Sequence, residues 1–265
     1  MYILAIETTG PVGSVAIIDE NKNVTMEVSA EEMNHLKDLM PMAQKLIDNL
    51  GLKKSDMAAV AASVGPGSFT GIRIGVSTAR AIAQALNIPA VSVPTLDAFK
   101  LKGDGVTILA PIFNARRGQV YGGVFDEQGE DILKSGPYML TDVFDAIETC
   151  VKDRLDDAPC GMAPSGRILF YGDGIDAYGQ QLEEFKAKMI KEAGSFVIGF
   201  AEKETRYQTA EMTARAAFSK FAEHDTLHFN QLEPEYMRAT EAEQKLKDGS
   251  LARERAAKMA RFKSR

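Results

Sequence analysis

Apolar and polar positions along the chain predict two copies of one folding unit. Each copy reads as an apolar strand, a glycine-containing turn, an alternating strand, a third strand and then a helix. Three matches recur in order with nearly constant spacing: Ile3-Leu4-Ala5 with Ile108-Leu109-Ala110, Gly13-Ser14-Val15 with Gly118-Gln119-Val120, and Asp19-Glu20 with Asp126-Glu127. The pattern predicts a duplicated β-β-β-α unit.

The pattern continues each unit with a further strand and helix. In the first copy it predicts helices over 31–50 and 69–86 and strands over 57–63 and 89–93. In the second copy it predicts helices over 141–155 and 175–189 and strands over 167–171 and 196–198, and a late helix covers 209–221. Mixed sheets flanked by helices and repeated twice predict an α/β fold with a cleft between two lobes. We expect 1–103 plus about 207–245 to form the first lobe, 104–206 a second, degenerate lobe, and 246–265 a basic C-terminal tail.

Composition narrows the class of protein. The 265 residues are 45% hydrophobic and 26% charged, which excludes a disordered or fibrous chain. The net charge of −6 argues against a strongly basic nucleic-acid binder, although the tail from Lys245 to Arg265 holds eight bases and two acids. We interpret this tail either as solvated or as a contact with RNA or an acidic partner. Two cysteines outside any C-x-x-C pair, no leader peptide and no long apolar run predict a cytoplasmic protein with no membrane contact.

Two helices carry more apolar or small residues than one buried face needs. In the helix over 69–86, small residues recur every four positions: Gly71, Gly75, Ala79 and Ala83. Arg73, Ser77, Arg80 and Gln84 form a separate polar stripe on the same helix. The helix over 31–50 has Leu39 and Leu46 beside its main apolar stripe. Ordinary core packing explains part of this pattern, and a contact with another subunit explains the remainder.

A glycine-rich loop precedes the helix over 69–86, and this loop is a candidate anion site. Backbone amides and the helix dipole at such a loop can hold a phosphate. The loop is not a P-loop, because no Lys-Ser/Thr pair follows its last glycine. Further candidates lie at the turn after the first strand of the first copy and at the matching turn of the second copy. The candidate nucleotide or phosphate residues of the loop and these turns are Glu7, Thr8, Thr9, Gly65, Gly67, Ser68, Arg116 and Arg117. Simple turns would have a similar sequence, so ATP or ADP is a candidate cofactor only. Gly172-Asp173-Gly174 is a weaker candidate for a third loop at the cleft.

No pattern of catalytic residues or metal ligands is complete. His224 and His228 are four residues apart, but the H-E-x-x-H and G-x-S-x-G patterns are both absent. We therefore assign no catalytic residue and no metal site. An ATP-dependent or metal-dependent enzyme of the same fold, acting through Glu7 or His228, stays open as the alternative.

One segment resembles the signature of a known family, TsaB (formerly YeaZ). The segment is Gly65-Pro66-Gly67-Ser68-Phe69-Thr70-Gly71-Ile72-Arg73-Ile74-Gly75. Supporting matches are Ile3-Leu4-Ala5-Ile6-Glu7-Thr8-Thr9, His35, Pro94-Thr95-Leu96-Asp97-Ala98, Ala115-Arg116-Arg117-Gly118-Gln119-Val120-Tyr121 and Pro234-Glu235-Tyr236-Met237-Arg238. The resemblance covers about 1–245. Glu7 and Thr9 depart from the family's usual Asp and Ser, and Phe113-Asn114 departs from its usual Ile-Asp.

The resemblance implies a fold and a role. The fold would be that of the actin-like and sugar-kinase ATPases (ASKHA), with duplicated ribonuclease-H-like lobes. The chain would be a non-catalytic subunit that activates the transferase TsaD in N6-threonylcarbamoyladenosine modification of tRNA position 37, together with the ATPase TsaE. It would reach tRNA through that complex and form a homodimer when alone. An older label, M22 glycoprotease, implies the enzyme alternative. The partner interface would contain His35, Leu39, Ala43, Phe69, Thr70, Arg73, Gly75, Ser77, Ala79 and Arg80.

Overall fold

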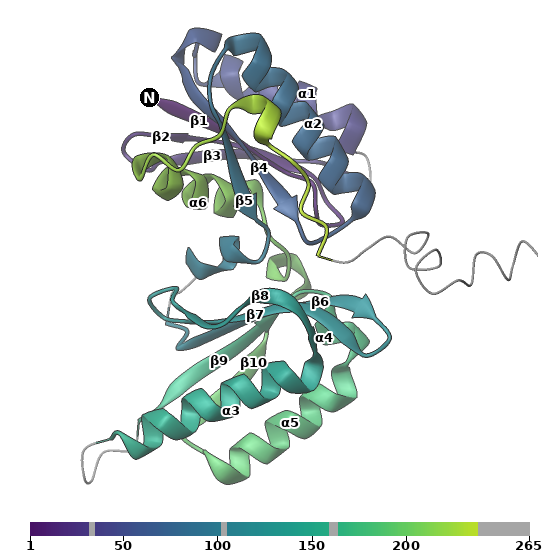
Figure 1. Ribbon diagram of the computed structural model, residues 1–265, viewed down its shortest axis with the longest axis vertical. Coiled ribbons are helices and arrows are strands. Elements are labelled where there is room, and N and C mark those ends of the chain that lie inside the picture. The colour runs from purple at the N-terminus through teal and green to yellow at the C-terminus, as the bar shows by residue number, and fades with distance from the viewer. Residues whose placement is uncertain (32–34, 102–104, 159–163, 238–265) are drawn as a thin grey trace, which may run out of the picture. The chain divides into compact units, whose positions relative to one another are not determined.

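The computed structural model describes residues 1–31, 35–101, 105–158 and 164–237. Met1–Glu235 forms one compact unit, and this unit contains two five-stranded sheets (Figure 1). We call the parts built on these sheets the first and second lobes. The predicted tail over 246–265 lies outside the described residues.

The first sheet has the strand order β3-β2-β1-β4-β5. Its strands are β1 (Tyr2–Glu7), β2 (Ser14–Asp19), β3 (Val24–Val28), β4 (Met57–Gly65) and β5 (Ala90–Pro94). β2 is antiparallel to β1 and β3, whereas β4 is parallel to β1 and β5. Both the central β1 and β4 are almost wholly buried, because helices cover both faces of the sheet.

Three helices cover the first sheet, and alternate residues of β1 show which face each one takes. Leu4 and Ile6 share an apolar core with α1 (His35–Asn49) and α2 (Phe69–Leu86). Glu7 faces the other side, where it meets Thr213 of α6 (Ala210–Ala222). α6 packs across β1 and β2, so a helix that is late in the chain completes the first lobe.

The second sheet repeats the first in its strand order, β8-β7-β6-β9-β10. Its strands are β6 (Ile108–Arg116), β7 (Gln119–Asp126), β8 (Asp131–Met139), β9 (Gly166–Tyr171) and β10 (Phe196–Phe200). The pairing senses are also the same: β7 is antiparallel to β6 and β8, and β9 is parallel to β6 and β10. The predicted duplicated α/β fold with ribonuclease-H-like lobes is confirmed.

The helices of the second lobe lie on one face of its sheet. α3 (Leu140–Asp156) and α5 (Gly179–Glu192) share the core that is formed by alternate residues of β6 and β9. On the opposite face, Phe113 and Tyr171 contact Phe99 of the short helix η2 (Asp97–Leu101). η2 in turn packs against α6, so this opposite face of the second sheet meets side chains of the first lobe.

One predicted helix is wrong in detail. The pattern predicts a single helix over 175–189, but the structure has α4 (Gly174–Ala177) and then α5. The break lies at Tyr178, whose backbone leaves the helical region with φ −126° and ψ 26°. The Tyr178 hydroxyl donates to the carbonyl oxygen of Gln119 at 3.0 Å, and this contact with β7 holds the residue at the break. Periodicity alone does not reveal such a contact.

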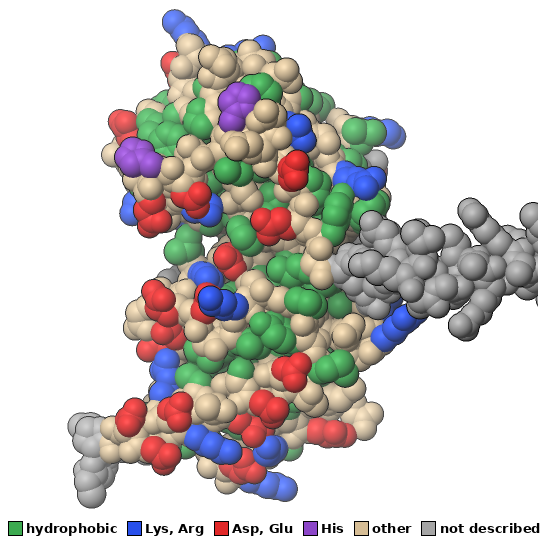
Figure 2. Space-filling view, in the orientation of Figure 1, with side chains coloured by type: hydrophobic (Ala, Val, Ile, Leu, Met, Phe, Trp, Pro, Cys, Tyr) green, Lys and Arg blue, Asp and Glu red, His purple; other side chains and the backbone are tan. Residues whose placement is uncertain are grey.

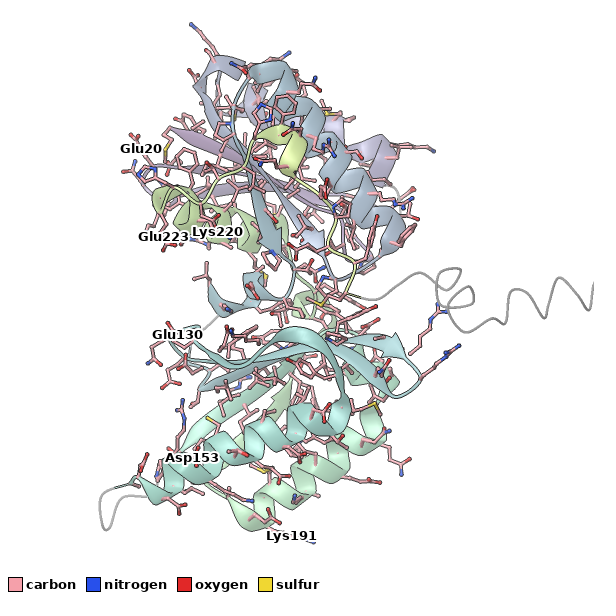
Figure 3. All side chains as sticks on the ribbon, viewed as in Figure 1. Glu20, Glu130, Asp153, Lys191, Lys220 and Glu223 are labelled. Carbon is pink, nitrogen blue, oxygen red and sulfur yellow. The ribbon has the colours of Figure 1, made fainter. Side chains whose placement is uncertain are left out.

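Charged side chains lie mainly on the periphery. Glu20, Lys220 and Glu223 project from the first lobe, and Asp153 and Lys191 project from the second (Figure 3). Acidic and basic side chains are interspersed over the visible face (Figure 2). None of the described helices combines the length and the apolar character that crossing a bilayer requires.

Candidate functional site

The glycine-rich loop lies directly against the end of β1. A Cβ atom on Gly71 would lie 1.9 Å from the carbonyl oxygen of Thr8, and one on Gly67 would lie 2.6 Å from the carbonyl oxygen of Thr9. Only glycine permits this approach, which places the start of α2 on the β1–β2 turn. The Ser68 hydroxyl accepts from the amide of Gly71 at 3.2 Å and so caps α2.

A buried carboxylate lies beneath this turn. Glu7 is fully buried, and its Oε1 accepts from the amide and the hydroxyl of Thr9, both at 2.5 Å. Its Oε2 accepts from the hydroxyls of Ser63 and Thr213. Burial raises the pKa of Glu7 above the ordinary carboxyl value, and these hydrogen bonds offset part of the rise.

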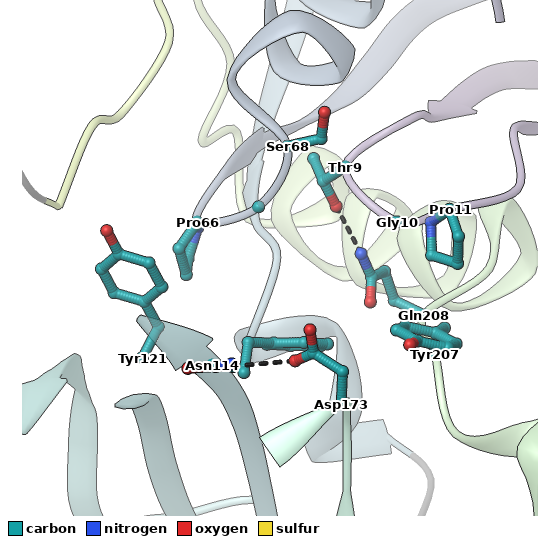
Figure 4. Close-up of a pocket in the computed structure, with 12 residues that line it drawn as sticks. Thr9, Gly10, Pro11, Pro66, Ser68, Asn114, Tyr121, Asp173, Tyr207 and Gln208 are labelled. Carbon is teal, nitrogen blue, oxygen red and sulfur yellow. Dashed lines mark hydrogen bonds between the residues drawn. The ribbon is translucent and has the colours of Figure 1, made fainter. Parts of the chain in front are cut away.

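A cleft of about 310 Å³ opens beside the turn, at the lower end of the range for small-molecule sites (Figure 4). Its lining comes from the β1–β2 turn, the glycine-rich loop, β6, β7, the end of β9 and the segment before α6. The lining residues are Thr9, Gly10, Pro11, Pro66, Gly67, Ser68, Phe113, Asn114, Tyr121, Asp173, Tyr207 and Gln208. Both lobes therefore contribute to the cleft.

Gln208 joins the cleft to the buried carboxylate. Its amide nitrogen donates to the Thr9 hydroxyl and, at 3.4 Å, to Glu7 Oε1. The Thr9 hydroxyl donates its single proton to Glu7, so it can only accept from Gln208. This fixes the amide orientation and turns Gln208 Oε1 away from Thr9. The oxygen is buried and has no hydrogen-bond partner among the described residues.

The second lobe supplies an acid, and the two lobes together supply a pair of aromatic rings to the cleft. Asp173 follows β9, and its Oδ1 accepts from the amide of Asn114 at 2.8 Å (Figure 4). Desolvation raises the pKa of the Asp173 carboxyl above its ordinary value. The rings of Phe113 and Tyr207 are stacked, with an interplanar angle of 22° and centroids 6.3 Å apart. The cleft thus combines an acceptor-rich polar part with an aromatic part.

The structure brings together only some of the predicted phosphate residues. Thr9, Gly67 and Ser68 line the cleft, whereas Glu7 and Thr8 are buried outside its lining and Gly65 packs beneath Glu235. Arg116 and Arg117 are exposed at the β6–β7 turn and do not line the cleft. Their backbone φ values of 65° and 55° belong to a tight hairpin turn. Of the candidate phosphate residues, Arg116 and Arg117 therefore lie outside this cleft.

The predicted partner surface divides into buried and exposed residues. Leu39, Ala43, Gly75 and Ala79 are buried within the first lobe, and a Cβ atom on Gly75 would lie 2.4 Å from the hydroxyl of Thr8. The small-residue stripe is used for packing on the lobe's own sheet, so we correct its assignment to a partner surface. Phe69, Thr70, Arg73 and Ser77 are exposed and Arg80 is half-buried. His35 begins α1, and its side chain lies outside the described part of the structure.

Large apolar side chains are exposed on the same two helices. On α1, Leu36 and Met40 are 77% and 54% exposed and are four residues apart, which places them on one helix face. On α2, Phe69 is 41% exposed, and the Arg73 guanidinium lies 4.0 Å from the centre of its ring. α1 and α2 are in contact on the same side of the first sheet. We call Leu36, Met40, Phe69 and Arg73 the helix surface.

His224 and His228, which are four residues apart in the sequence, are not grouped with other metal-ligating side chains in the described part of the structure. His224 follows the end of α6, and the ring of His228 contacts Asn230 Oδ1 at 2.6 Å. Across the described ranges, no three His, Cys, Asp or Glu side chains are grouped so that they could hold a metal ion.

Comparison with known proteins gives the family. Residues 27–246 match the family model described as TsaD: tRNA N6-adenosine threonylcarbamoyltransferase. The chain is also 30% identical over 190 residues to the tRNA threonylcarbamoyladenosine biosynthesis protein TsaB of Bacillus subtilis, covering 69% of this chain and 76% of that protein. The chain belongs to the TsaB (YeaZ) family. The TsaB protein of Escherichia coli is 34% identical over 135 residues, covering 49% of this chain and 58% of its own length.

Solved structures support the same fold for this TsaB-family chain. YeaZ from Pseudomonas aeruginosa is 22% identical and superimposes with a TM-score of 0.61, covering 89% of this chain and 99% of that one. A second Pseudomonas aeruginosa structure, described as an uncharacterized protein with similarity to peptidase YEAZ, gives a TM-score of 0.64 at 23% identity over the same shares.

Tyr207 and Gln208 are among the cleft residues that sequence reasoning missed. They precede the predicted helix over 209–221 in a segment without a motif, and their partners Phe113 and Thr9 are far away in the chain. Asp173 gave a weak signal, because it lies between two glycines after a predicted strand. No local signal marks Gln208 as buried, since glutamine is usually an exposed residue.

Proposed function

We propose that this chain is a non-catalytic subunit that binds and activates a TsaD-type transferase in the biosynthesis of threonylcarbamoyladenosine in tRNA. Membership of the TsaB family supports the pathway, because the Bacillus subtilis and Escherichia coli relatives bear that name. The TsaE ATPase and tRNA would join through the transferase complex.

The observation that carries the partner role is the helix surface. Leu36, Met40 and Phe69 expose large apolar side chains on two neighbouring helices. Contiguous exposed apolar side chains mark interaction sites on soluble proteins. Aromatic residues, methionine and arginine are also the side chains enriched in protein interfaces, and Arg73 packs over Phe69. A partner with an apolar helix face would bury this surface, and a second copy of the chain would use it in a homodimer.

The test is a pair of matched double substitutions in the full chain. Leu36→Glu with Met40→Glu places two charges in the helix surface, and we expect at least a tenfold loss of affinity for the TsaD-type transferase. The control, Ile190→Glu with Val197→Glu, makes the same change at positions of the second lobe that are 57% and 63% exposed. We expect the control to keep full affinity. Affinity is measured with purified proteins by calorimetry.

A second readout separates binding from activity. In a reconstituted reaction with the transferase, TsaE and tRNA, the helix-surface variant is expected to lower the yield of threonylcarbamoyladenosine in proportion to the lost complex. Sedimentation of the isolated chain shows whether the same variant also dissociates a homodimer. Unchanged affinity and yield in a folded helix-surface variant would contradict the proposed role of this surface.

A further inference from the structure

The cleft contains a buried acceptor with no partner. Gln208 is 4% exposed, and its Oε1 has no hydrogen-bond partner among the described residues. A buried unsatisfied carbonyl is costly, so native structures normally provide a donor for it. The Thr9 hydroxyl cannot serve, because its proton is donated to Glu7. The missing donor must come from the cleft, which Gln208 lines.

The charge of the lining indicates what kind of donor the cleft accepts. Among its lining residues, Asp173 is acidic and none is lysine or arginine. Phosphate-binding sites provide positive charge or free helix amides. Here the Ser68 hydroxyl already accepts from the Gly71 amide at the start of α2, and the Ser68 amide donates to the carbonyl oxygen of Thr9 at 2.8 Å. The electrostatics therefore favour a cation over a phosphate.

The remaining lining suits an apolar body. Phe113 and Tyr207 form a stacked aromatic pair, and Pro11 and Pro66 contribute further apolar lining (Figure 4). Aromatic faces attract organic cations. Asp173 is held toward the cleft by the Asn114 amide, and partial burial disfavours its charge, while Asp176 and Arg206 act on it in opposite senses.

We propose that this cleft binds a small organic ammonium ion, whose N–H groups donate to Gln208 Oε1 and to the Asp173 carboxylate while its apolar body lies against Phe113 and Tyr207. This ligand site is separate from the helix surface. Its failure would leave the proposed partner role intact, and the converse also holds.

The experiment compares three probes of the same shape on the full, ¹⁵N-labelled chain. Benzylamine is cationic at neutral pH, benzyl alcohol is uncharged and benzoate is anionic. We expect benzylamine to shift the side-chain amide resonances of Gln208 and the backbone amide of Asn114, with an affinity about tenfold above that of benzyl alcohol, since a hydrogen bond to a charged group is worth that much. Benzoate and ATP are expected to leave these resonances unchanged.

Two variants locate the interaction. Asp173→Asn keeps an oxygen for the Asn114 amide but removes the charge, and we expect the affinity for benzylamine to fall about tenfold to that of benzyl alcohol. Glu183→Gln removes one charge from an exposed position on α5 of the same lobe and is expected to have no effect. Should Asp173→Asn fail to fold, Gln208→Met removes the other proposed acceptor, Gln208 Oε1, in its place. Equal affinity for benzylamine and benzyl alcohol, tighter binding of benzoate or ATP, or an unchanged Asp173→Asn variant would overturn the proposal.

Discussion

The two lobes share one strand order but secure their helices in different ways. In the first lobe, Gly71 and Gly75 let α2 approach Thr8 after the end of β1, Gly71 at its carbonyl oxygen and Gly75 at its hydroxyl. In the second lobe, aromatic side chains fill the space between helices and sheet: Phe144 stacks on Phe185 with centroids 4.1 Å apart, and both meet Phe170 edge-on. The same topology therefore tolerates a close, small-residue interface and a wide, aromatic one.

The lobes also differ at the end of their central strands. Glu7 closes β1 within a network of hydroxyl and amide donors, on the face of the sheet opposite α1 and α2. On the corresponding face of β6, opposite α3 and α5, the ring of Phe113 contacts Phe99. The polar network joins Thr9 and Gln208 of the first lobe to the cleft. The difference shows that the first lobe departs from ordinary core packing where it borders the cleft.

The prediction with the largest expected effect concerns the close packing of α2 against the end of β1. Gly71→Ala would place a methyl group 1.9 Å from the carbonyl oxygen of Thr8, so the backbone must shift. We expect a loss of about 3 kcal/mol in the free energy of unfolding. The matched control is Gly179→Ala at the start of α5, where a Cβ atom meets nothing within 4 Å. We expect that variant to change stability by less than about 1 kcal/mol. Urea unfolding measures both, and equal losses would remove the contrast between the lobes.

The second prediction concerns the pH dependence that Glu7 gives to the first lobe. The folded chain raises the pKa of Glu7 above its ordinary value of 4.5, so the unfolded chain loses this proton first as pH rises. The stability contributed by Glu7 is therefore greatest below pH 4.5, and it falls with rising pH until the folded carboxyl ionises, by at most about 1.4 kcal/mol per pH unit. Glu7→Gln should remove this slope. Urea unfolding at a series of pH values compares the two proteins, and an identical slope in the variant would contradict the assignment.

The smallest expected effect concerns how the helices begin. Ser68 caps α2 through its side chain, whereas Met139, the residue before α3, donates its amide to Asp142 inside the helix. Ser68→Ala should cost about 1 kcal/mol of stability. Ser77→Ala, on the exposed face of the same helix, should change it by less than about 0.5 kcal/mol. Thermal unfolding of the two variants provides the measurement, and an equal loss in both would contradict the capping role of Ser68.

The sequence by itself determined the duplicated fold and the two helices of the helix surface, α1 and α2. Hydrophobic periodicity is local, so it predicted both sheets and the helix over 69–86, which matches α2 (Phe69–Leu86) at both ends. The glycine-rich motif also identified a loop that lines the cleft. These features depend on neighbours within a few residues, which a linear pattern records.

Only the tertiary structure decided what each face contacts. The stripe of Gly75 and Ala79 is equally compatible with a partner helix and with the lobe's own sheet, and the close approach of Thr8 selected the sheet. Glu7, Ser63 and Gln208 meet across most of the chain length, so no local spacing predicts their network. Burial and hydrogen-bond satisfaction arise from contacts between distant segments, and those contacts form only when the chain is folded.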